Sequence, residues 1–254
     1  MPLTKEELIR KTTLKRNFNK YNKQLISDYE DMIDEGVNGT VGQNDVNDFV
    51  KQYVQLATPL ITSSFLDTYK ATNGYVPAMV SINKLMKQIV NIYKVKMKEN
   101  ISNSVNRLNE LNIDKVMYNK LRTDGATITE ALSVSDKNML GNYAPCSEKL
   151  LEQSLKNQQR SIENRADYHY NSNLLDGNGD KVYTHKTWVW SGAENTRHSG
   201  MDNVTIPIDE PFVVVNEVSG DIDYLMYPCD DNGSPSNTYN CLCDIVYSNE
   251  FYGI

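Results

Sequence analysis

Residues 186–212 read KTWVWSGAENTRHSGMDNVTIPIDEPF and hold both tryptophans of the chain and one of its three histidines. Residues 187–190 are β-branched or aromatic, which favours a strand, and residues 191–195 carry the turn-forming Ser, Gly and Asn that would end it. Residues 204–208 alternate in polarity and contain Pro207, which predicts a second short strand at a sheet edge. The stretch therefore predicts two strands joined by a polar loop.

Arg197 and His198 lie in that loop and place a cationic donor beside a titratable imidazole. Such a pair commonly anchors a loop to a carboxylate or a carbonyl, and an acid/base site formed with Asp202 is the alternative interpretation. The sequence contains no serine elbow, no phosphate-binding glycine loop, no HExxH and no zinc-deaminase signature. We therefore expect no catalytic residues and no enzymatic activity.

The segments around this stretch also favour strands. Residues 176–180 read DGNGD, but the glutamate that closes a calcium loop is absent, so a hairpin-type turn is expected, with a strand over 182–184. Residues 213–215 and 221–227 predict a hairpin, a loop follows through Pro235, and residues 243–247 alternate like a last strand. Together they predict a small antiparallel sheet.

The first half of the chain has helical periodicity. Apolar residues between 8 and 33 predict a helix that Glu35-Gly36 and Asn38-Gly39 end, and a second helix begins near Asn44 and is broken or kinked by Pro59. Residues 76–99 carry the broadest apolar stripe, which predicts a helix packed on more than one side.

Three further helices are expected over residues 104–122, 127–132 and 147–170. Pro145 marks a boundary between the helical and the strand-rich parts. The sequence thus predicts an α+β protein, with a mainly helical domain over 1–145 and a small antiparallel-sheet domain over 146–254.

Charge is distributed unevenly along the chain, whose formal net charge is −7. Residues 81–122 hold nine Lys or Arg against three acidic residues, whereas residues 201–254 hold ten acidic residues and no Lys or Arg. The basic helix could face DNA or an acidic protein surface, and a solvated helix face is the alternative. The candidate nucleic-acid contacts are Lys84, Lys87, Lys94, Lys96 and Lys98.

The four cysteines, at positions 146, 229, 241 and 243, do not form a disulfide framework in a chain of this length. Cys241 and Cys243 with Cys229 and either His198 or His185 would supply the four ligands of a zinc site. The alternative is that the thiols pack as small apolar groups under the Trp190 loop. We expect no cofactor and leave zinc open. No signal peptide and no membrane span is expected.

Several separated elements resemble one known family. They are ENTRHSGMD at 194–202, IDEPF at 208–212, Pro228 with Asp230, NGS at 232–234, and Asn240-Cys241-Xaa-Cys243. Their order and spacing are similar to the head-morphogenesis domain of tailed-phage minor head proteins, the family that includes the F protein of phage Mu. The resemblance covers roughly residues 150–254. Its motif residues are Trp188, Trp190, Thr196, Arg197, His198, Asp202, Asp209, Glu210, Phe212, Asn240, Cys241 and Cys243.

The chain departs from that family at a few positions. The family often carries Gly where this chain has Asn203 and Cys229, and Arg where it has Leu242. Many members have a Cys-Xaa-Xaa-Cys pair upstream, where this chain has Arg197 and His198. These departures bear on a metal site more than on the fold.

The resemblance implies a structural protein of a bacteriophage virion that acts in head morphogenesis and capsid assembly. Its expected partners are the portal protein and the capsid or scaffold proteins, in an oligomeric particle, with DNA as a further candidate during packaging or ejection. Its expected location is the capsid interior or the portal vertex, after synthesis in the host bacterial cytoplasm and with no membrane partner. The alternatives are an enzyme or toxin-like effector that uses the Arg197/His198 loop, and a DNA-binding module that uses the lysine-rich helix.

Overall fold

The computed structural model describes residues 5–39, 41–73, 79–192 and 197–249, and it confirms the predicted α+β class. It divides into two compact units, one formed by Met1–Thr62 with Pro77–Leu155 and one by Ser63–Val76 with Lys156–Ile254. The boundary expected at Pro145 lies just before the helix in which this division falls. The helices are α1 (Lys5–Asn38), α2 (Gln43–Asn73), α3 (Met79–Glu110), α4 (Lys115–Thr123), α5 (Ile128–Ser135), α6 (Glu148–Asn173) and α7 (Pro235–Thr238), with short 3-10 turns η1 (Ala144–Cys146) and η2 (Ser199–Met201).

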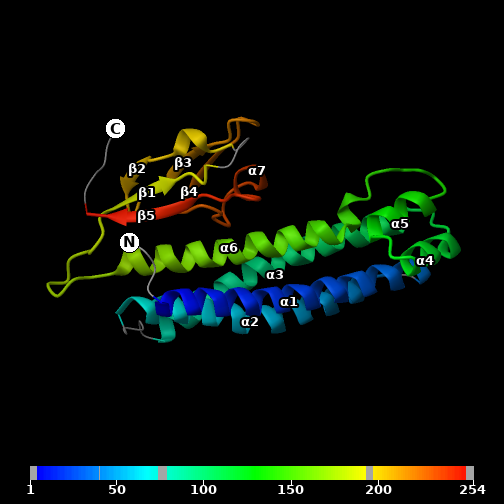
Figure 1. Cartoon of the computed structure of the whole chain (residues 1–254), viewed down its shortest axis with the longest axis horizontal. Helices are drawn as coiled ribbons and strands as arrows, with labels where there is room; N and C mark the ends of the chain where they lie inside the picture. The colour runs from blue at the N-terminus through cyan, green and yellow to red at the C-terminus, as the bar shows by residue number, and fades with distance from the viewer. Residues whose placement is uncertain (1–4, 40, 74–78, 193–196, 250–254) are drawn as a thin grey trace. The chain divides into compact units, whose positions relative to one another are not determined.

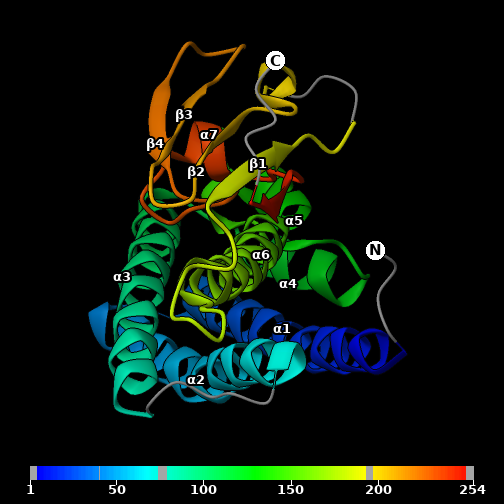
Figure 2. The ribbon, with the colours of Figure 1, turned by 90° about the vertical axis from the view of Figure 1, so that its left-hand side faces the viewer.

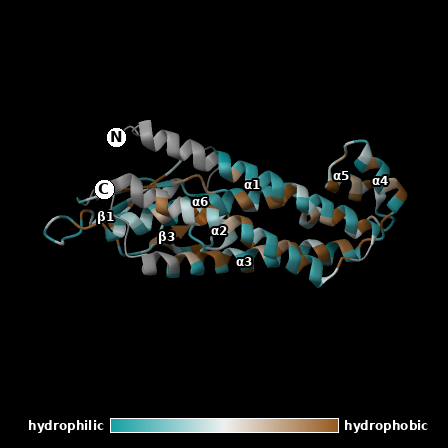
Figure 3. Ribbon diagram, turned by 90° about the horizontal axis from the view of Figure 1, so that it is seen from below, coloured by the Kyte–Doolittle hydropathy of each residue, from teal (hydrophilic) through white to brown (hydrophobic). Residues whose placement is uncertain are grey.

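The first unit is built on long helices that lie side by side (Figures 1 and 2). α1 and α2 are antiparallel. Tyr21 contacts Tyr53, whereas Tyr29, which lies later in α1, packs edge-on against Phe49, which lies earlier in α2. Polar and apolar residues alternate in short blocks along α1, α2 and α3 (Figure 3), which is the pattern of helices that bury one side. Leu25, Ile33, Ile61, Ile89, Tyr93 and Met97 are at most 1% exposed and form the centre of this core.

Pro59 does not break the second helix, so that alternative of the sequence interpretation is wrong. α2 runs through Pro59 without interruption. Proline removes one backbone donor, but Ala57 and Ile61 on either side of it are 4% and 1% exposed, so their packing holds the helix in place. The hydroxyl of Thr62 also donates to the carbonyl of Thr58 at 2.8 Å.

The break expected between residues 99 and 104 is also absent, and α3 continues to Glu110. Ile101, Val105 and Leu108 are buried and prolong the apolar stripe at helical spacing. The interruption falls later, where the Asp114 carboxylate accepts hydrogen bonds from two backbone N–H groups at 3.1 Å and caps the start of α4. The start predicted for the helix after α4 is also confirmed, because Thr127 and Glu130 form a capping box at the first residues of α5.

α1 ends at Asn38, which confirms the expected Asn38-Gly39 stop, and Gly36 lies inside the helix, where α1 meets α3. A Cβ at this position would overlap the side chain of Val41 and approach Leu108 Cδ2 to 2.7 Å. We expect Gly36→Ala to lower the free energy of unfolding of the first unit by about 1–3 kcal/mol through overpacking, despite the better helix propensity of alanine. Gly42→Ala is the control, because nothing lies within 4 Å of its added Cβ. Urea unfolding followed by far-ultraviolet circular dichroism measures both, and equal midpoints for the two variants would contradict the packing argument.

The second unit contains two small antiparallel sheets (Figure 1). Strands β1 (His185–Val189), β2 (Thr205–Pro207) and β5 (Asp244–Ser248) form one sheet in the order β2-β1-β5, and β3 (Phe212–Val215) pairs with β4 (Ile222–Leu225) in the other. His185 is opposite Pro207 on one side and Ser248 on the other. Pro207 therefore lies on an edge strand, as predicted.

Two local predictions in this unit need correction. Residues 182–184 are not a strand, since β1 begins at His185, although the hairpin-type turn before them is present as a bridge between Leu175 and Lys181. Pro235 does not continue the loop but starts α7, where its fixed φ suits the first helical position. The last strand begins at Asp244, so Cys243 lies just before it. No helix in the described ranges is long and apolar enough to cross a membrane.

Candidate functional site

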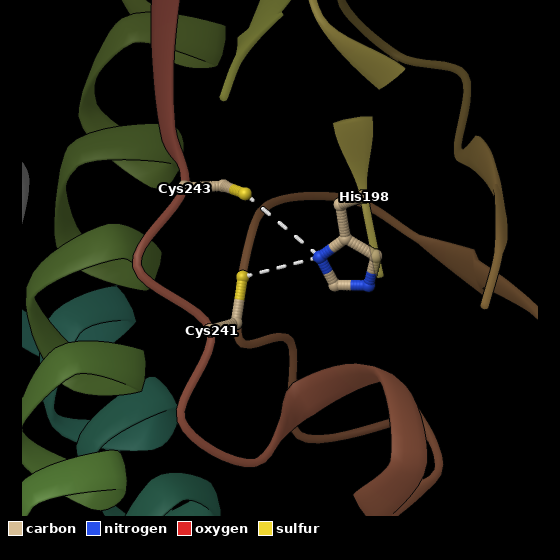
Figure 4. Close-up of side chains that lie close together, drawn as sticks. All are labelled: His198, Cys241 and Cys243. Atoms are coloured by element: carbon tan, nitrogen blue, oxygen red, sulfur yellow. Dashed lines mark hydrogen bonds between the residues drawn. The ribbon is translucent and has the colours of Figure 1, made fainter. Parts of the chain in front are cut away.

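His198, Cys241 and Cys243 meet inside the second unit, although more than forty residues separate the histidine from the thiols in sequence. The Nδ1 atom of His198 lies 3.6 Å from the Cys241 Sγ and 3.8 Å from the Cys243 Sγ. All three ligand atoms are within 4.8 Å of one another, and the three side chains are buried. Figure 4 shows both sulfur atoms directed at the same edge of the imidazole.

The segment before β5 positions the two thiols. Leu242 is 52% exposed while its two cysteine neighbours are buried, so the chain already alternates before the strand begins. Arg160 of α6 donates to the carbonyl of Leu242 at 2.7 Å and to that of Cys243 at 3.3 Å. Asn157 accepts from the backbone N–H of Asn240 at 3.0 Å. Helix α6 therefore fixes the cysteine-bearing segment through its backbone.

Cys229 adds a third thiol to this region. Its Sγ donates to the carbonyl of Cys241 at 3.2 Å, and its backbone has a φ of 62°. Contact with the Cys229 thiol, together with burial, raises the pKa of Cys241 to about 12. Contact with Cys241 and burial raise the pKa of Cys243 to about 12, although His198 and the indole of Trp188 act in the opposite direction. The thiols of Cys241 and Cys243 are therefore protonated at neutral pH.

A hydrogen-bond chain fixes the proton position on His198. The carboxylate of Asp223 accepts from the Nδ2 of Asn237 at 2.9 Å, which turns the Asn237 Oδ1 towards the Nε2 of His198 at 3.2 Å. Because that oxygen can only accept, Nε2 carries the proton and Nδ1 presents its lone pair to the thiols. Burial opposes ionisation of Asp223, but hydrogen bonds from Ser234 and Asn237 prevail and lower its pKa. Asp223, at the start of this hydrogen-bond chain, is thus ionised at neutral pH.

Trp188 closes the site from the side of the sheet. It is fully buried, and its ring stands edge-on to those of His198 at 5.6 Å and Phe212 at 5.2 Å. Its Nε1 is buried and finds no hydrogen-bond acceptor in the described part of the chain. Trp190, under which the thiols were expected to pack, is only partly buried against the same core. The tryptophan that contacts the imidazole is therefore Trp188.

The other motif residues take separate positions. Asp202 accepts from the backbone N–H of Trp190 at 2.9 Å and anchors the end of β1. Asp209 forms an exposed ion pair with Lys181, and the backbone N–H of Glu210 donates to the carbonyl of Pro207 at 3.1 Å. The carbonyl of Arg197 accepts a hydrogen bond from the backbone N–H of Glu217 at 3.3 Å. Thr196 lies outside the described residues, and His185 lies on β1 with its Nδ1 2.8 Å from the Thr184 hydroxyl, apart from the metal-ligand group.

The lysine candidates lie on α3 in the first unit. Lys84, Lys87, Lys94 and Lys98 are exposed, whereas Lys96 is partly buried. At 100° per residue the four exposed positions fall within about 80° of one another around the helix axis, and Lys96 falls on another side. The structure therefore brings together four of the five residues in one basic stripe.

Sequence reasoning missed Lys186, which is fully buried in β1. Its Nζ donates to the carbonyl of Met226 at 2.9 Å and lies over the rings of Tyr168 at 4.7 Å and Phe212 at 5.1 Å. Burial lowers its pKa to about 8, against the opposing attraction of Asp230 and other carboxylates. A lysine in a short polar-apolar strand gives no sequence signal for burial, because β1 is covered on both faces only in the folded unit.

Lys186 makes stability rise with pH in a defined window. Its pKa in the folded chain, about 8, is below that of the unfolded chain, so between the two values the unfolded state binds more protons. We expect the wild-type second unit to gain on the order of 1 kcal/mol relative to Lys186→Met between pH 7 and pH 9. Lys181→Met, which removes an exposed lysine, is the control. Denaturant titrations at both pH values measure the difference, and parallel pH profiles for wild type and Lys186→Met would contradict it.

The chemistry available to the cluster is metal ligation more than catalysis. A Cys/His pair that attacks a substrate must be reachable, yet His198, Cys241 and Cys243 are 2%, 4% and 2% exposed. Two thiols and an imidazole lone pair directed at one point are the ligands that a soft or borderline divalent metal prefers. Comparison of the chain with models of protein families, with curated proteins and with solved structures found no match.

Proposed function

We propose that this chain is a minor head protein of a tailed bacteriophage. In this proposal it is a structural component of the virion that acts in capsid assembly and contacts the portal, capsid or scaffold proteins. It performs no catalysis, and its place is the capsid interior or the portal vertex. The proposal starts from the resemblance of residues 150–254 to the head-morphogenesis domain.

The backbone at two departures from the family carries the proposal. Asn203 and Cys229 replace residues that are often glycine in that family, and both have positive φ, at 61° and 62°. Glycine is the usual residue at such positions because it has no Cβ to clash. These two backbone conformations support the proposal, because they are ones that the family's glycines would also suit.

The packing of the motif residues also supports a single structural module. Trp188, Phe212, Cys241 and Cys243 belong to one buried cluster in the second unit, and His198 lies against it. These residues come from β1, β3 and the segments that precede η2 and β5. Their burial favours a folded scaffold over the effector alternative, because an acid/base site at His198 would need access for a substrate.

The composition of particles tests this function directly. The full-length chain is expressed with the portal, scaffold and major capsid proteins of the genome that encodes it, and procapsids are isolated by sedimentation. We expect the chain to sediment with the particles, to be detected by mass spectrometry, and to be recovered with the portal protein. A chain that stays in the soluble fraction and binds none of the three proteins would contradict the proposal.

The basic stripe on α3 favours DNA as an additional contact. Four exposed lysines on one side of a helix can neutralise about four phosphates, which gives a slope of log affinity against log salt of about −3 to −4. Replacement of Lys84, Lys87, Lys94 and Lys98 by Gln should flatten that slope, whereas Lys96→Gln should leave it nearly unchanged. Fluorescence anisotropy with duplex DNA at several salt concentrations measures both slopes. If replacement of all four lysines leaves the slope unaffected, this stripe is not the DNA contact.

A further inference from the structure

We propose that His198, Cys241 and Cys243 bind one Zn²⁺ ion, with Cys229 as the fourth ligand. This goes beyond the proposed function and does not depend on it, because the argument uses only the geometry of the second unit. It also differs from the expectation that the chain holds no cofactor. Each ligand comes from a buried position, so the site is a closed, structural one.

The spacing of the ligand atoms fits a tetrahedral ion. With Zn–S bonds of about 2.3 Å and Zn–N bonds of about 2.0–2.1 Å, two ligands of a tetrahedron are about 3.6 Å apart for a nitrogen and a sulfur. The observed Nδ1···Sγ distances are 3.6 Å to Cys241 and 3.8 Å to Cys243. The two nitrogen–sulfur distances therefore suit a zinc ion between the three atoms, while the two sulfurs, which lie within 4.8 Å of each other, would close to about 3.8 Å around it.

The histidine is already in the tautomer that a metal requires. The Nε2 proton is directed to Asn237, and Asn237 is itself held by the ionised Asp223. Metal-binding histidines usually donate their second N–H to an oxygen in this way, which fixes the ring and leaves the other nitrogen free to coordinate. On its other side the ring presents Nδ1 to the thiols of Cys241 and Cys243.

Two buried donors near Cys243 lack acceptors. The Nε1 of Trp188 and the Nε of Arg160 are both buried without a hydrogen-bond partner in the described residues. The Trp188 indole packs in the same buried cluster as Cys243, and the Arg160 guanidinium already donates to the carbonyl of Cys243. A zinc-bound thiolate is a much better acceptor than a thiol, and it carries a negative charge that Arg160 offsets.

Cys229 is the residue that we assign as the fourth zinc ligand. A residue other than glycine or asparagine is disfavoured at a φ of 62°, so the side chain there is expected to have a compensating role. Its thiol contacts Cys241, yet its Sγ is not in the group of ligand atoms that lie within 4.8 Å of one another. Rotation of the Cys229 side chain towards the ion would complete the set. Binding then converts three thiols to thiolates and releases three protons per zinc ion.

Metal analysis of the intact chain tests this site. The full-length protein is purified without chelator from zinc-supplemented cells, and its zinc content is measured by inductively coupled plasma mass spectrometry. We expect one zinc ion per chain. After exchange for Co²⁺ we expect the thiolate-to-cobalt charge-transfer absorption of a tetrahedral site. A wild-type chain that contains no zinc and takes up neither zinc nor cobalt overturns the proposal, whatever the variants do.

Variants assign the ligands. The double variant Cys241→Ser/Cys243→Ser should lose zinc, whereas Cys146→Ser should retain it, because Cys146 is an equally buried thiol in the other unit. Asn237→Leu keeps the side-chain volume but removes the acceptor for Nε2, and it should weaken zinc binding by about 10–100-fold. Full zinc content in the double variant overturns the proposal. Unchanged affinity in Cys229→Ser overturns the assignment of the fourth ligand.

Discussion

Trp188→Ala is expected to lower the free energy of unfolding of the second unit by about 3–5 kcal/mol, the range typical of a fully buried aromatic residue. Trp188 has no exposed surface and contacts both the imidazole of His198 and the ring of Phe212. Its removal leaves a cavity between the two sheets and the thiol cluster. The loss should affect the second unit and leave the helices of the first unit folded.

Trp190→Ala is the matched control, since Trp190 lies two positions further along and is only partly buried. We expect a much smaller loss from this change. The chain has no other tryptophan, so each variant retains one indole in the second unit as a fluorescent reporter. Circular dichroism then follows the helices separately. If the two variants unfold at the same denaturant concentration, the assignment of Trp188 as the central core residue is wrong.

Asp136→Asn is expected to lower the free energy of unfolding of the first unit by about 2–4 kcal/mol, since hydrogen bonds to a charged group are worth about 1.5–3 kcal/mol each. The buried Asp136 carboxylate accepts from the N–H groups of Asn112, Asn138 and Leu140 and from the hydroxyl of Tyr143, at 2.9–3.3 Å. It therefore ties the end of α5 to the segments on both sides. The side-chain amide of Asn at this position has the same shape, but its NH₂ group would face N–H or O–H donors and could not accept their hydrogen bonds.

Acid should reproduce this loss in the wild-type protein. Burial opposes ionisation of Asp136, but its hydrogen bonds with Leu140, Asn138, Tyr143 and Asn112 prevail and lower its pKa. A carboxyl whose folded pKa is depressed stabilises the fold above the unfolded pKa, and that contribution is lost as pH falls through the folded value. Urea titrations between pH 7 and pH 3 should therefore show a steeper decline for wild type than for Asp136→Asn. Asp124→Asn is the exposed control and should follow the wild-type curve, and identical slopes for all three proteins would refute the role of Asp136.

The two proposals make different demands on the same module. The head-protein proposal requires that the second unit be a stable structural part, and the zinc proposal explains how a small unit with two short sheets could be stabilised. A chain that binds zinc but is absent from procapsids would retain the metal site and lose the phage function. A chain found in particles without zinc would retain the phage function and lose the metal site.

The sequence by itself determined the features that depend on a few neighbouring residues. The capping box at Thr127 and Glu130, the β3–β4 hairpin and the edge position of Pro207 follow from turn, cap and backbone chemistry that acts over a few positions. The α+β class follows for the same reason, because the change from helical periodicity to strand alternation is visible along the chain. Fold class and most elements could therefore be predicted without a structure.

The tertiary structure alone decided which side of each element is covered. Packing carries α2 through Pro59, extends α3 past the expected break, and buries Trp188 fully but Trp190 only partly. The candidate site showed the same limit: its cysteines and histidine were named from the sequence, but the Asp223-Asn237 chain and the buried Lys186 were not. These features depend on contacts between residues distant in sequence, and no local pattern specifies which partner will arrive.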